Sequence, residues 1–530
     1  MSEEKSFSPE QATSLQGQYY LGIDNGTQGL SVVLVDPQTL QVLATGEGSY
    51  GMVEESSTSS EEEGCYEQST ADWDSALQEA MAEVRRQMKN HPLQVLAIGI
   101  SGQMHGEVLC DEEGTALGNV RLWCDARNGP EGEELTELFR TKVPKRSTCA
   151  RFLWTIRNQT DKAQRTRHLT TPAGWTAYRL TGEWNLGIGD AAGMFPIDQS
   201  TLDYDESLLN AFDRLVEDTS NESSIPKLRS ILPQVRTAGE DAGSLNRIGA
   251  ELLGLPEGIP VAAAEGDQVA ALAGSLIGRA GMVSCSFGTS VCANSVGDRQ
   301  FQGVSNAVDQ FCAHDGKPIN MVWLRNGTTF MNSIVRGYGG FDQVMPELVN
   351  APADCGGLLA LPFMDDEPGL QVSKGGTAMI IGYNSDNSTR GNAAKAALLS
   401  TIFNLKLGSG VLDDQGYPRT ELILTGGLVK TPECGQILAD VFNVPVTVME
   451  GGDEGCAVGA AIMAKYRHLK QTQTSSGYHD DWPTFLECVK PKESRNFQPN
   501  KENVPVYEQI YQKYRKLLKV QQSLNEAVTM

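Results

Sequence analysis

One short pattern occurs twice in this sequence, near the start and again past the middle. Residues 20–35 read as an apolar strand, an Asn-Gly-Thr turn and a second apolar strand, and residues 282–293 repeat the order strand, Gly-Thr turn, strand. A strand, a glycine-containing turn and a returning strand form a β-hairpin. The match between the two copies is short, but it indicates an internal duplication and hence two halves that begin in the same way.

The length of the chain also indicates two domains. It has 530 residues, whereas single hydrophobic cores stop growing at roughly 250–300 residues. We expect a flexible N-terminal tail over residues 1–18, an N-terminal domain over 19–275 and a C-terminal domain over 276–530. Polar segments around 218–224 and 470–480 are expected to be loops.

Strands and helices alternate along the sequence, which is typical of an α/β architecture. Residues 261–274 read as a strand, a glycine turn and the start of a helix. The remaining predicted elements are strands at 19–24, 30–35, 41–45, 95–100 and 421–425, and helices at 72–90, 453–464 and 504–519.

The composition excludes several classes of protein. No apolar run reaches the ~18–20 residues that span a bilayer, and the N-terminus lacks the features of a signal peptide, so a cytoplasmic protein is expected. The net charge of −24 disfavours nucleic acid and anionic membranes as partners. It does not disfavour a nucleotide, because local donors and a metal ion can outweigh a distant field. Part of the charge lies in Glu54 to Glu63, which reads as a solvated loop.

The cysteines give no sign of a disulfide framework or a zinc site. Their number is 11, which is odd, and they are scattered without a C-x-x-C pair. We expect buried free thiols in a reducing compartment.

The first hairpin turn has the residues of a phosphate-binding loop. Its glycines let backbone N–H groups approach an anion, and Thr27 adds a hydroxyl donor. Asp24, at the strand end, can hold Mg²⁺ through water, because this ion prefers carboxylates and keeps part of its hydration shell. The plain alternative is a structural hairpin turn. The second Gly-Thr turn, from Ser286 to Ser290, favours the first interpretation, because two such hairpins can grip a polyphosphate from both sides of a cleft.

A glycine pair follows the predicted strand 421–425. Gly426 and Gly427 can let an adenine ring lie flat against the backbone, although such pairs also mark turns and helix starts. The sequence contains neither G-x-x-x-x-G-K-[ST] nor G-x-G-x-x-G. A nucleotide would therefore bind through the paired hairpins.

Asp267 is the candidate catalytic base. It lies between an apolar strand and a small-residue helix, at a strand's carboxyl end, where α/β folds bind ligands. Phosphoryl transfer to a sugar hydroxyl needs a base close to that hydroxyl. A helix N-cap is an equally weighted alternative for this aspartate.

Two other segments offer contacts to a polyol. In the segment Ser101 to Gly106, His105 can donate to a sugar hydroxyl and Gln103 can donate or accept; a histidine bonded only within its loop is the alternative. Trp123 and Asp125 can supply an aromatic wall and polar contacts. Their alternative is a core tryptophan beside a surface Asp–Arg pair.

Taken in order, these segments resemble the FGGY carbohydrate kinase family, and within it the kinases of xylulose. The resemblance spans about residues 19–519. The matching pieces are GIDNGTQG at 22–29, EQSTADW at 67–73, SGQMHG at 101–106, WCDARN at 123–128, TGEWNLGIGDAAG at 181–193, GDQ at 266–268, SFGTS at 286–290, LTGGLVKTP at 424–432 and the small-residue helix at 455–461.

The resemblance implies an α/β fold of two actin-like (ribonuclease H-like) ATPase domains with an interdomain cleft, and it makes Asp267 the general base. Together with the residue patterns, it gives a sugar-binding set of Gln103, Met104, His105, Trp123, Asp125, Asp267 and Gln268. The nucleotide-binding set is Asp24, Gly26, Thr27, Gln28, Gly288, Thr289, Gly426, Gly427 and Lys430, with Asp24 also at the metal. Many members of the family have Asn or Ser at the position of Lys430.

The expected activity is ATP- and Mg²⁺-dependent phosphorylation of a ketose, D-xylulose to D-xylulose 5-phosphate. Ribulose, sedoheptulose, gluconate and glycerol remain alternative substrates, and a catalytically silent sensor or a chaperone-like ATPase are alternatives of other classes. The expected partners are the sugar and MgATP, with a homodimer left open.

Overall fold

The structure is a computed structural model, and it describes residues 17–52, 64–219, 224–449, 455–472, 480–489 and 494–528. Glu54 to Glu63 and most of the expected tail lie outside the described residues. The chain divides into two compact units. The first consists of Met1–Gly278, Phe311–Pro318 and Asp453–Lys490, and the second of Arg279–Gln310, Ile319–Gly452 and Pro491–Met530.

The first unit is built on a five-stranded sheet in the order β13-β5-β1-β2-β3. Its strands are β1 (Gln18–Asn25), β2 (Gly29–Val35), β3 (Val42–Ser49), β5 (Gln94–Gly102) and β13 (Glu265–Gly266). β1, β2 and β3 form an antiparallel meander, while β5 runs parallel to β1 and β13 parallel to β5.

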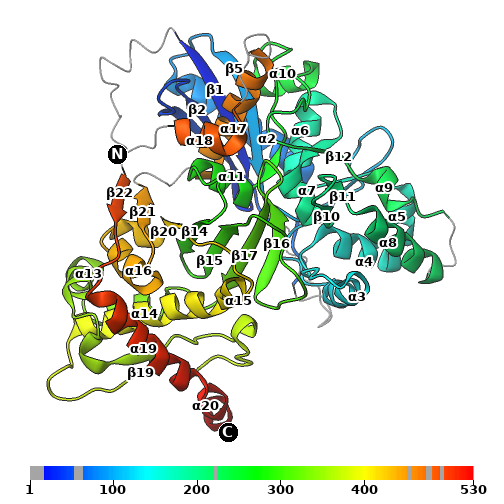
Figure 1. The fold of residues 1–530 in the computed structure, drawn as a ribbon. Helices are drawn as coiled ribbons and strands as arrows, with labels where there is room; N and C mark the ends of the chain where they lie inside the picture. The colour runs from blue at the N-terminus through cyan, green and yellow to red at the C-terminus, as the bar shows by residue number, and fades with distance from the viewer. Residues whose placement is uncertain are drawn as a thin grey trace. The chain divides into compact units, whose positions relative to one another are not determined.

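The strands are apolar on both faces because helices cover both. α2 (Thr70–Gln87) packs on β2 and β3, and α17 (Gly455–Thr472) packs on β1 and β5 (Figure 1). Glycines make these approaches close. A Cβ atom on Gly46 would lie 1.9 Å from the backbone oxygen of Ala80 in α2, and one on Gly99 would lie 1.8 Å from that of Ala460 in α17.

Replacing Gly99 with valine is expected to destabilise the first unit by about 3 kcal/mol, because α17 would have to move away from the sheet. Chemical denaturation measures this loss. Gly51→Ala is the matched control, since a Cβ there would have nothing within 4 Å, and it should change stability little. Equal stability of the two variants would contradict the packing described for α17.

The long connection between β5 and β13 forms the rest of the first unit. Its elements are β6 (Val108–Cys110), β7 (Val120–Arg121), α3 (Gly129–Phe139), α4 (Thr148–Asn158), α5 (Thr160–Arg165), β8 (His168–Thr170), α6 (Pro172–Thr181), β9 (Asn185–Gly187), α7 (Ile188–Met194), β10 (Ile197–Asp198), β11 (Asp203–Tyr204), α8 (Glu206–Thr219), α9 (Leu228–Ile231), β12 (Gln234–Arg236) and α10 (Arg247–Leu253). β4 (Glu67–Gln68), α11 (Asp267–Gly274) and α18 (Trp482–Cys488) complete the unit.

The second unit repeats the strand arrangement of the first. Its seven-stranded sheet has the order β16-β17-β15-β14-β20-β21-β22. β14, β15 and β17 form an antiparallel meander, β20 runs parallel to β14, and β21 runs parallel to β20. The predicted duplication is therefore a duplication of sheet topology.

The helices of the second unit cover its sheet, and α14 packs against both α13 and α19. The strands are β14 (Met282–Phe287), β15 (Val291–Val296), β16 (Val308–Cys312), β17 (Pro318–Leu324), β18 (Leu359–Leu361), β19 (Met379–Ile381), β20 (Glu421–Gly426), β21 (Val446–Met449) and β22 (Ser494–Phe497). The helices are α12 (Thr329–Gly337), α13 (Phe341–Asn350), η1 (Cys355–Gly357), η2 (Pro368–Leu370), α14 (Arg390–Gly408), α15 (Gly410–Asp414), η3 (Gly427–Lys430), α16 (Cys434–Phe442), α19 (Asn503–Leu518) and α20 (Gln521–Val528).

The predicted strands and helices are confirmed, with differences at their ends. Only Glu265 and Gly266 of the expected strand in 261–274 form a named strand. α8 continues to Thr219 and α17 to Thr472, so parts of two expected loops are helical. Residues 220–223 and 473–479 of those loops lie outside the described residues. A further helix, α20, follows the expected terminal one.

The cysteines depart from the sequence analysis in one respect. All eleven cysteines are free; most are buried, three are half-buried, and Cys488 is exposed, which corrects the expectation that all are buried. Within the described parts of the chain, no helix combines the length and the apolar character that crossing a membrane requires.

Candidate active site

Three parallel strands of the first unit end at one edge of its sheet. The register pairs Asp24 of β1 with Ser101 of β5, and Ser101 with Glu265 of β13. The residues that follow, the first hairpin turn, the segment 103–106 and Asp267, therefore emerge at the same edge. This is where α/β folds bind ligands, and it gathers residues far apart in the sequence.

Asp24 and Asp267 carry the electrostatics of this edge. Ser101 donates a hydrogen bond of 2.8 Å from its Oγ to Oδ1 of Asp24, and burial raises the pKa of Asp24 in spite of that bond. Asp267 is the first residue of α11. Burial and then the charge of Asp24 raise the pKa of Asp267 to about 7, against the hydrogen bonds from the backbone and side chain of Gln268. A carboxyl group with such a pKa is suited to accept a proton near neutral pH.

The side-chain amides of Gln103 and Gln68 form hydrogen bonds to the first hairpin turn. Gln103, fully buried, donates from Nε2 to the backbone oxygen of Gly26 at 3.3 Å and to Oε1 of Gln68 at 2.9 Å. Its Oε1 accepts from the hydroxyl of Thr27 at 3.3 Å. Gln68 in turn donates to the backbone oxygen of Thr27 at 2.7 Å. Gln28, at the tip, is exposed. The geometry thus indicates that Gln103 supports the turn through its hydrogen bonds to Gly26 and Thr27.

Trp123 is exposed and Asp125 is buried, the reverse of the core tryptophan and surface Asp–Arg pair that the sequence analysis offered as the alternative. Trp123 is 45% exposed rather than in the core, and its Nε1 donates to Oγ1 of Thr27 at 3.0 Å. Asp125 is buried. It accepts hydrogen bonds from Arg121 at 3.0 Å and from Arg127 at 2.6 Å. Burial opposes ionisation, but these two arginines outweigh it and lower the pKa of Asp125. Its carboxylate therefore belongs to a buried ion-pair network.

Met104 packs against Gly266, the residue that precedes α11, and His105 follows Met104 in sequence. A Cβ on Gly266 would lie 2.2 Å from Cγ of Met104, so only glycine fits at that position. His105 has a left-handed backbone with φ of 66°, and such conformations persist at functional sites. Its Nδ1 lies 3.0 Å from the backbone oxygen of Gly193.

The tautomer of His105 follows from these contacts. Burial, together with the charges of Arg146 and Arg151, lowers the pKa of His105 to about 3, although the Gly193 carbonyl opposes this. The ring is therefore neutral near pH 7. Because a carbonyl oxygen can only accept, Nδ1 carries the proton and Nε2 is left as an acceptor. The sequence suggested a donor at this position; the geometry favours an acceptor.

A buried acidic cluster lies behind Asp267. The side chain of Glu265 is fully buried. It accepts from the backbone N–H of Asp190 at 2.8 Å and of Gly189 at 3.4 Å, and it lies 2.8 Å from Nδ1 of His314. Asp190 is also buried and accepts from the Thr171 hydroxyl at 2.5 Å. Sequence reasoning gave none of these residues a role. Glu265 adjoins the predicted Gly-Asp-Gln motif and Asp190 lies in a matched segment, whereas nothing in the sequence points to His314.

In the second unit, two other predicted loops meet. Phe287 of β14 pairs with Gly426 of β20, so the second Gly-Thr turn and the glycine pair emerge at one edge. Gly426 has φ of 75°, and a Cβ there would lie 2.9 Å from backbone atoms of Phe287. The backbone oxygen of Gly288 accepts from the N–H of Thr328 at 2.8 Å. Thr289, Gly427 and Lys430 are exposed.

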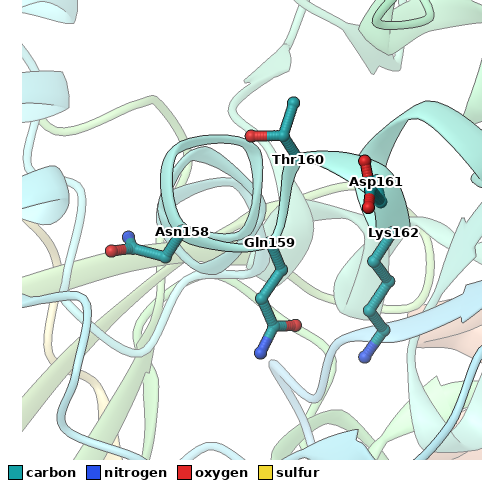
Figure 2. Close-up of a pocket in the computed structure, with 5 residues that line it drawn as sticks. All are labelled: Asn158, Gln159, Thr160, Asp161 and Lys162. Carbon is teal, nitrogen blue, oxygen red and sulfur yellow. The ribbon is translucent and has the colours of Figure 1, made fainter.

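Elsewhere in the first unit, an open depression of about 460 Å³ is formed by the turn between α4 and α5 (Figure 2). It is lined by Asn158, Gln159, Thr160, Asp161 and Lys162, and none of these is a predicted site residue. The described residues contain no group of three or more His, Cys, Asp or Glu side chains that could hold a metal ion by themselves.

The family comparisons cover most of the chain. Residues 19–274 match the N-terminal domain of the FGGY family of carbohydrate kinases, and residues 283–468 match its C-terminal domain. The chain is 27% identical to the xylulose kinase of Haemophilus influenzae, over 93% of this chain and 98% of that protein. It is 29% identical to the xylulose kinase of Streptomyces coelicolor, over 85% and 88% respectively.

Solved structures resemble this one along nearly its whole length. A xylulose kinase from Rhodospirillum rubrum aligns with a TM-score of 0.77 at 21% identity, covering 96% of this chain and 99% of that one. A gluconate kinase from Lactobacillus acidophilus aligns with the same TM-score at 18% identity, again covering 96% and 99%. At these identities the likeness establishes the fold, and it confirms the predicted architecture of two actin-like domains.

Proposed function

We propose that this chain, which belongs to the FGGY family of carbohydrate kinases, transfers the terminal phosphoryl group of ATP to a ketose, with D-xylulose as its preferred substrate and D-xylulose 5-phosphate as the product. The observation that carries the proposal is the pairing of Asp24 and Asp267 at one sheet edge, with the pKa of Asp267 raised to about 7. The names of the relatives support the choice of sugar.

In the proposed reaction, Asp267 accepts the proton of the acceptor hydroxyl as that oxygen attacks the γ-phosphorus, and ADP leaves. Nε2 of His105 accepts a hydrogen bond from another sugar hydroxyl, while Met104 and the Trp123 ring contact the carbon skeleton. Gln268 orients the base through its hydrogen bond. Most of the rate enhancement in such transfers comes from positioning and electrostatics.

We place the phosphates of ATP at the first hairpin turn, with Gly26, Thr27 and Gln28, and at the second, with Gly288 and Thr289. The adenosine lies against Gly426, Gly427 and Lys430. Asp24 fits Mg²⁺ as a single carboxylate, because its negative charge raises the pKa of Asp267 and a cation at Asp24 would offset that charge. When bound, the ion neutralises phosphate charge.

The enzyme works in the cytoplasm.

The rate should depend on the ionisation of Asp267. Because the base must be unprotonated and its pKa is about 7, kcat/KM is expected to fall about tenfold for each pH unit below pH 7. Initial rates between pH 5 and pH 9, at saturating Mg²⁺, measure this fall in kcat/KM. A flat profile down to pH 5 would contradict the assignment of Asp267 as the base.

ADP release from a panel of sugars tests the function. Purified protein is incubated with MgATP and D-xylulose, D-ribulose, sedoheptulose, gluconate or glycerol. The highest kcat/KM is expected with D-xylulose. A higher value with another sugar would keep the reaction and overturn the substrate, whereas ATP binding without ADP release from any sugar would indicate a silent sensor.

A further inference from the structure

The hydroxyl of Thr27 is held from two sides in the first hairpin turn. Nε1 of Trp123 lies 3.0 Å from it and Oε1 of Gln103 lies 3.3 Å from it. An indole N–H can only donate, so Thr27 accepts from Trp123. The amide nitrogen of Gln103 is turned to Gly26 and Gln68, so its oxygen faces Thr27 and receives the hydroxyl proton. The chain of donors therefore runs from Trp123 through Thr27 to Gln103.

The two ends of this chain differ in exposure and position. Gln103 is fully buried and directly precedes Met104 and His105. The backbone of Trp123 is held by the buried Arg151, which donates to its carbonyl oxygen at 2.7 Å, yet the residue is 45% exposed. A large apolar ring with that exposure can pack against the CH groups of a sugar. It cannot turn away without releasing the Thr27 hydroxyl.

We propose that Trp123 is a positioning residue that couples the binding of the sugar to the binding of ATP. This inference rests on the proposed function. A sugar that packs on the ring restrains the indole, and the indole N–H then restrains the Thr27 hydroxyl in the phosphate-binding turn. Because the turn is then already ordered when ATP arrives, ATP binds more tightly. By linkage, ATP strengthens the binding of the sugar by the same factor.

The coupling is measured as a ratio of affinities. Titration calorimetry gives the Kd of a non-hydrolysable ATP analogue with Mg²⁺, with and without saturating D-xylulose. For the wild-type protein we expect the sugar to tighten binding by about 10-fold, within the range usual for coupled sites. Because the readout is a ratio, a variant that weakens ATP binding by itself does not alter it.

Four variants and one control separate the effect of the hydrogen bonds from that of the ring. Trp123→Phe keeps an aromatic ring and removes only the N–H, and it should reduce the coupling to about twofold or less. Thr27→Val should do the same, and the double variant should add nothing to either. Thr27→Ser keeps the hydroxyl and should retain the wild-type coupling. Trp323→Phe is the matched control, because Trp323 is 42% exposed in the second unit, and it should leave the coupling unchanged.

Wild-type coupling in Trp123→Phe or in Thr27→Val, or no coupling in the wild-type protein, would overturn the inference. Thermal unfolding of each variant excludes general loss of structure as the cause. The inference and the proposed function fail separately. Absence of any sugar phosphorylation by the wild-type protein defeats the function, whereas normal turnover with unchanged coupling in Trp123→Phe defeats only the role of Trp123.

Discussion

Asp267→Asn is expected to lower kcat by about 10²- to 10⁴-fold, the usual contribution of a general base. Asparagine has nearly the shape of aspartate, so the start of α11 and the contacts of Gly266 with Met104 should persist. What is lost is the carboxylate that accepts the hydroxyl proton. Initial rates of ADP release with D-xylulose, at saturating MgATP, measure the effect. Turnover within about threefold of the wild type would contradict the role of Asp267.

The stability of the same variant serves as its control. The pKa of Asp267 is raised from 3.8 to about 7 in the folded state, so between these pH values the folded state holds a proton that the unfolded state has lost. Charging Asp267 therefore weakens the folded state progressively as pH rises toward 7. Asp267→Asn removes this penalty. Its melting temperature should exceed that of the wild type at pH 8 and approach it near pH 4.

Glu265→Leu is expected to lower the free energy of unfolding by about 3–5 kcal/mol, because three buried hydrogen-bond donors lose their acceptor at once. Leucine cannot accept hydrogen bonds, so Nδ1 of His314 and the backbone N–H groups of Gly189 and Asp190 would lose their buried acceptor. Buried donors without partners are strongly unfavourable. Chemical denaturation followed by tryptophan fluorescence measures the change.

Two comparison variants test this effect: Glu265→Gln as a milder change at the same site and Glu251→Leu as a surface control. Glutamine keeps one acceptor oxygen, and the loss of stability should fall to about 1–2 kcal/mol. Glu251 pairs with Arg247 on the exposed face of α10, and exposed pairs contribute little, so Glu251→Leu should change stability by less than about 0.5 kcal/mol. Equal losses for Glu265→Leu and Glu251→Leu would contradict the structural role of Glu265.

Local patterns were enough to predict the elements that bring the site together. Apolar runs ending in Asp24 and in Ser101 predicted two strands, and the glycine turn before Asp267 predicted a helix start. Because β1, β5 and β13 are parallel, these ends meet at one edge. The repeated Gly-Thr turn likewise predicted a duplication, which the two sheets display in their strand order.

Contacts between distant segments could not be predicted in this way. His314 reaches Glu265 across 49 residues, and α17 and α18 pack with the first unit although they follow most of the second in sequence. The partners of individual side chains could not be predicted either. The segment around Asp125 allowed contact with a sugar or an arginine, and it gave no sign that Asp125 pairs with the buried Arg121.

The most direct test of the central claim follows the transferred phosphoryl group. The protein is incubated with D-xylulose and ATP labelled in the γ-phosphate, and both ADP and the labelled product are quantified. The account predicts one labelled sugar phosphate for each ADP formed, with D-xylulose 5-phosphate as the product and almost no inorganic phosphate. Release of the label as inorganic phosphate, or no transfer to D-xylulose, would contradict it.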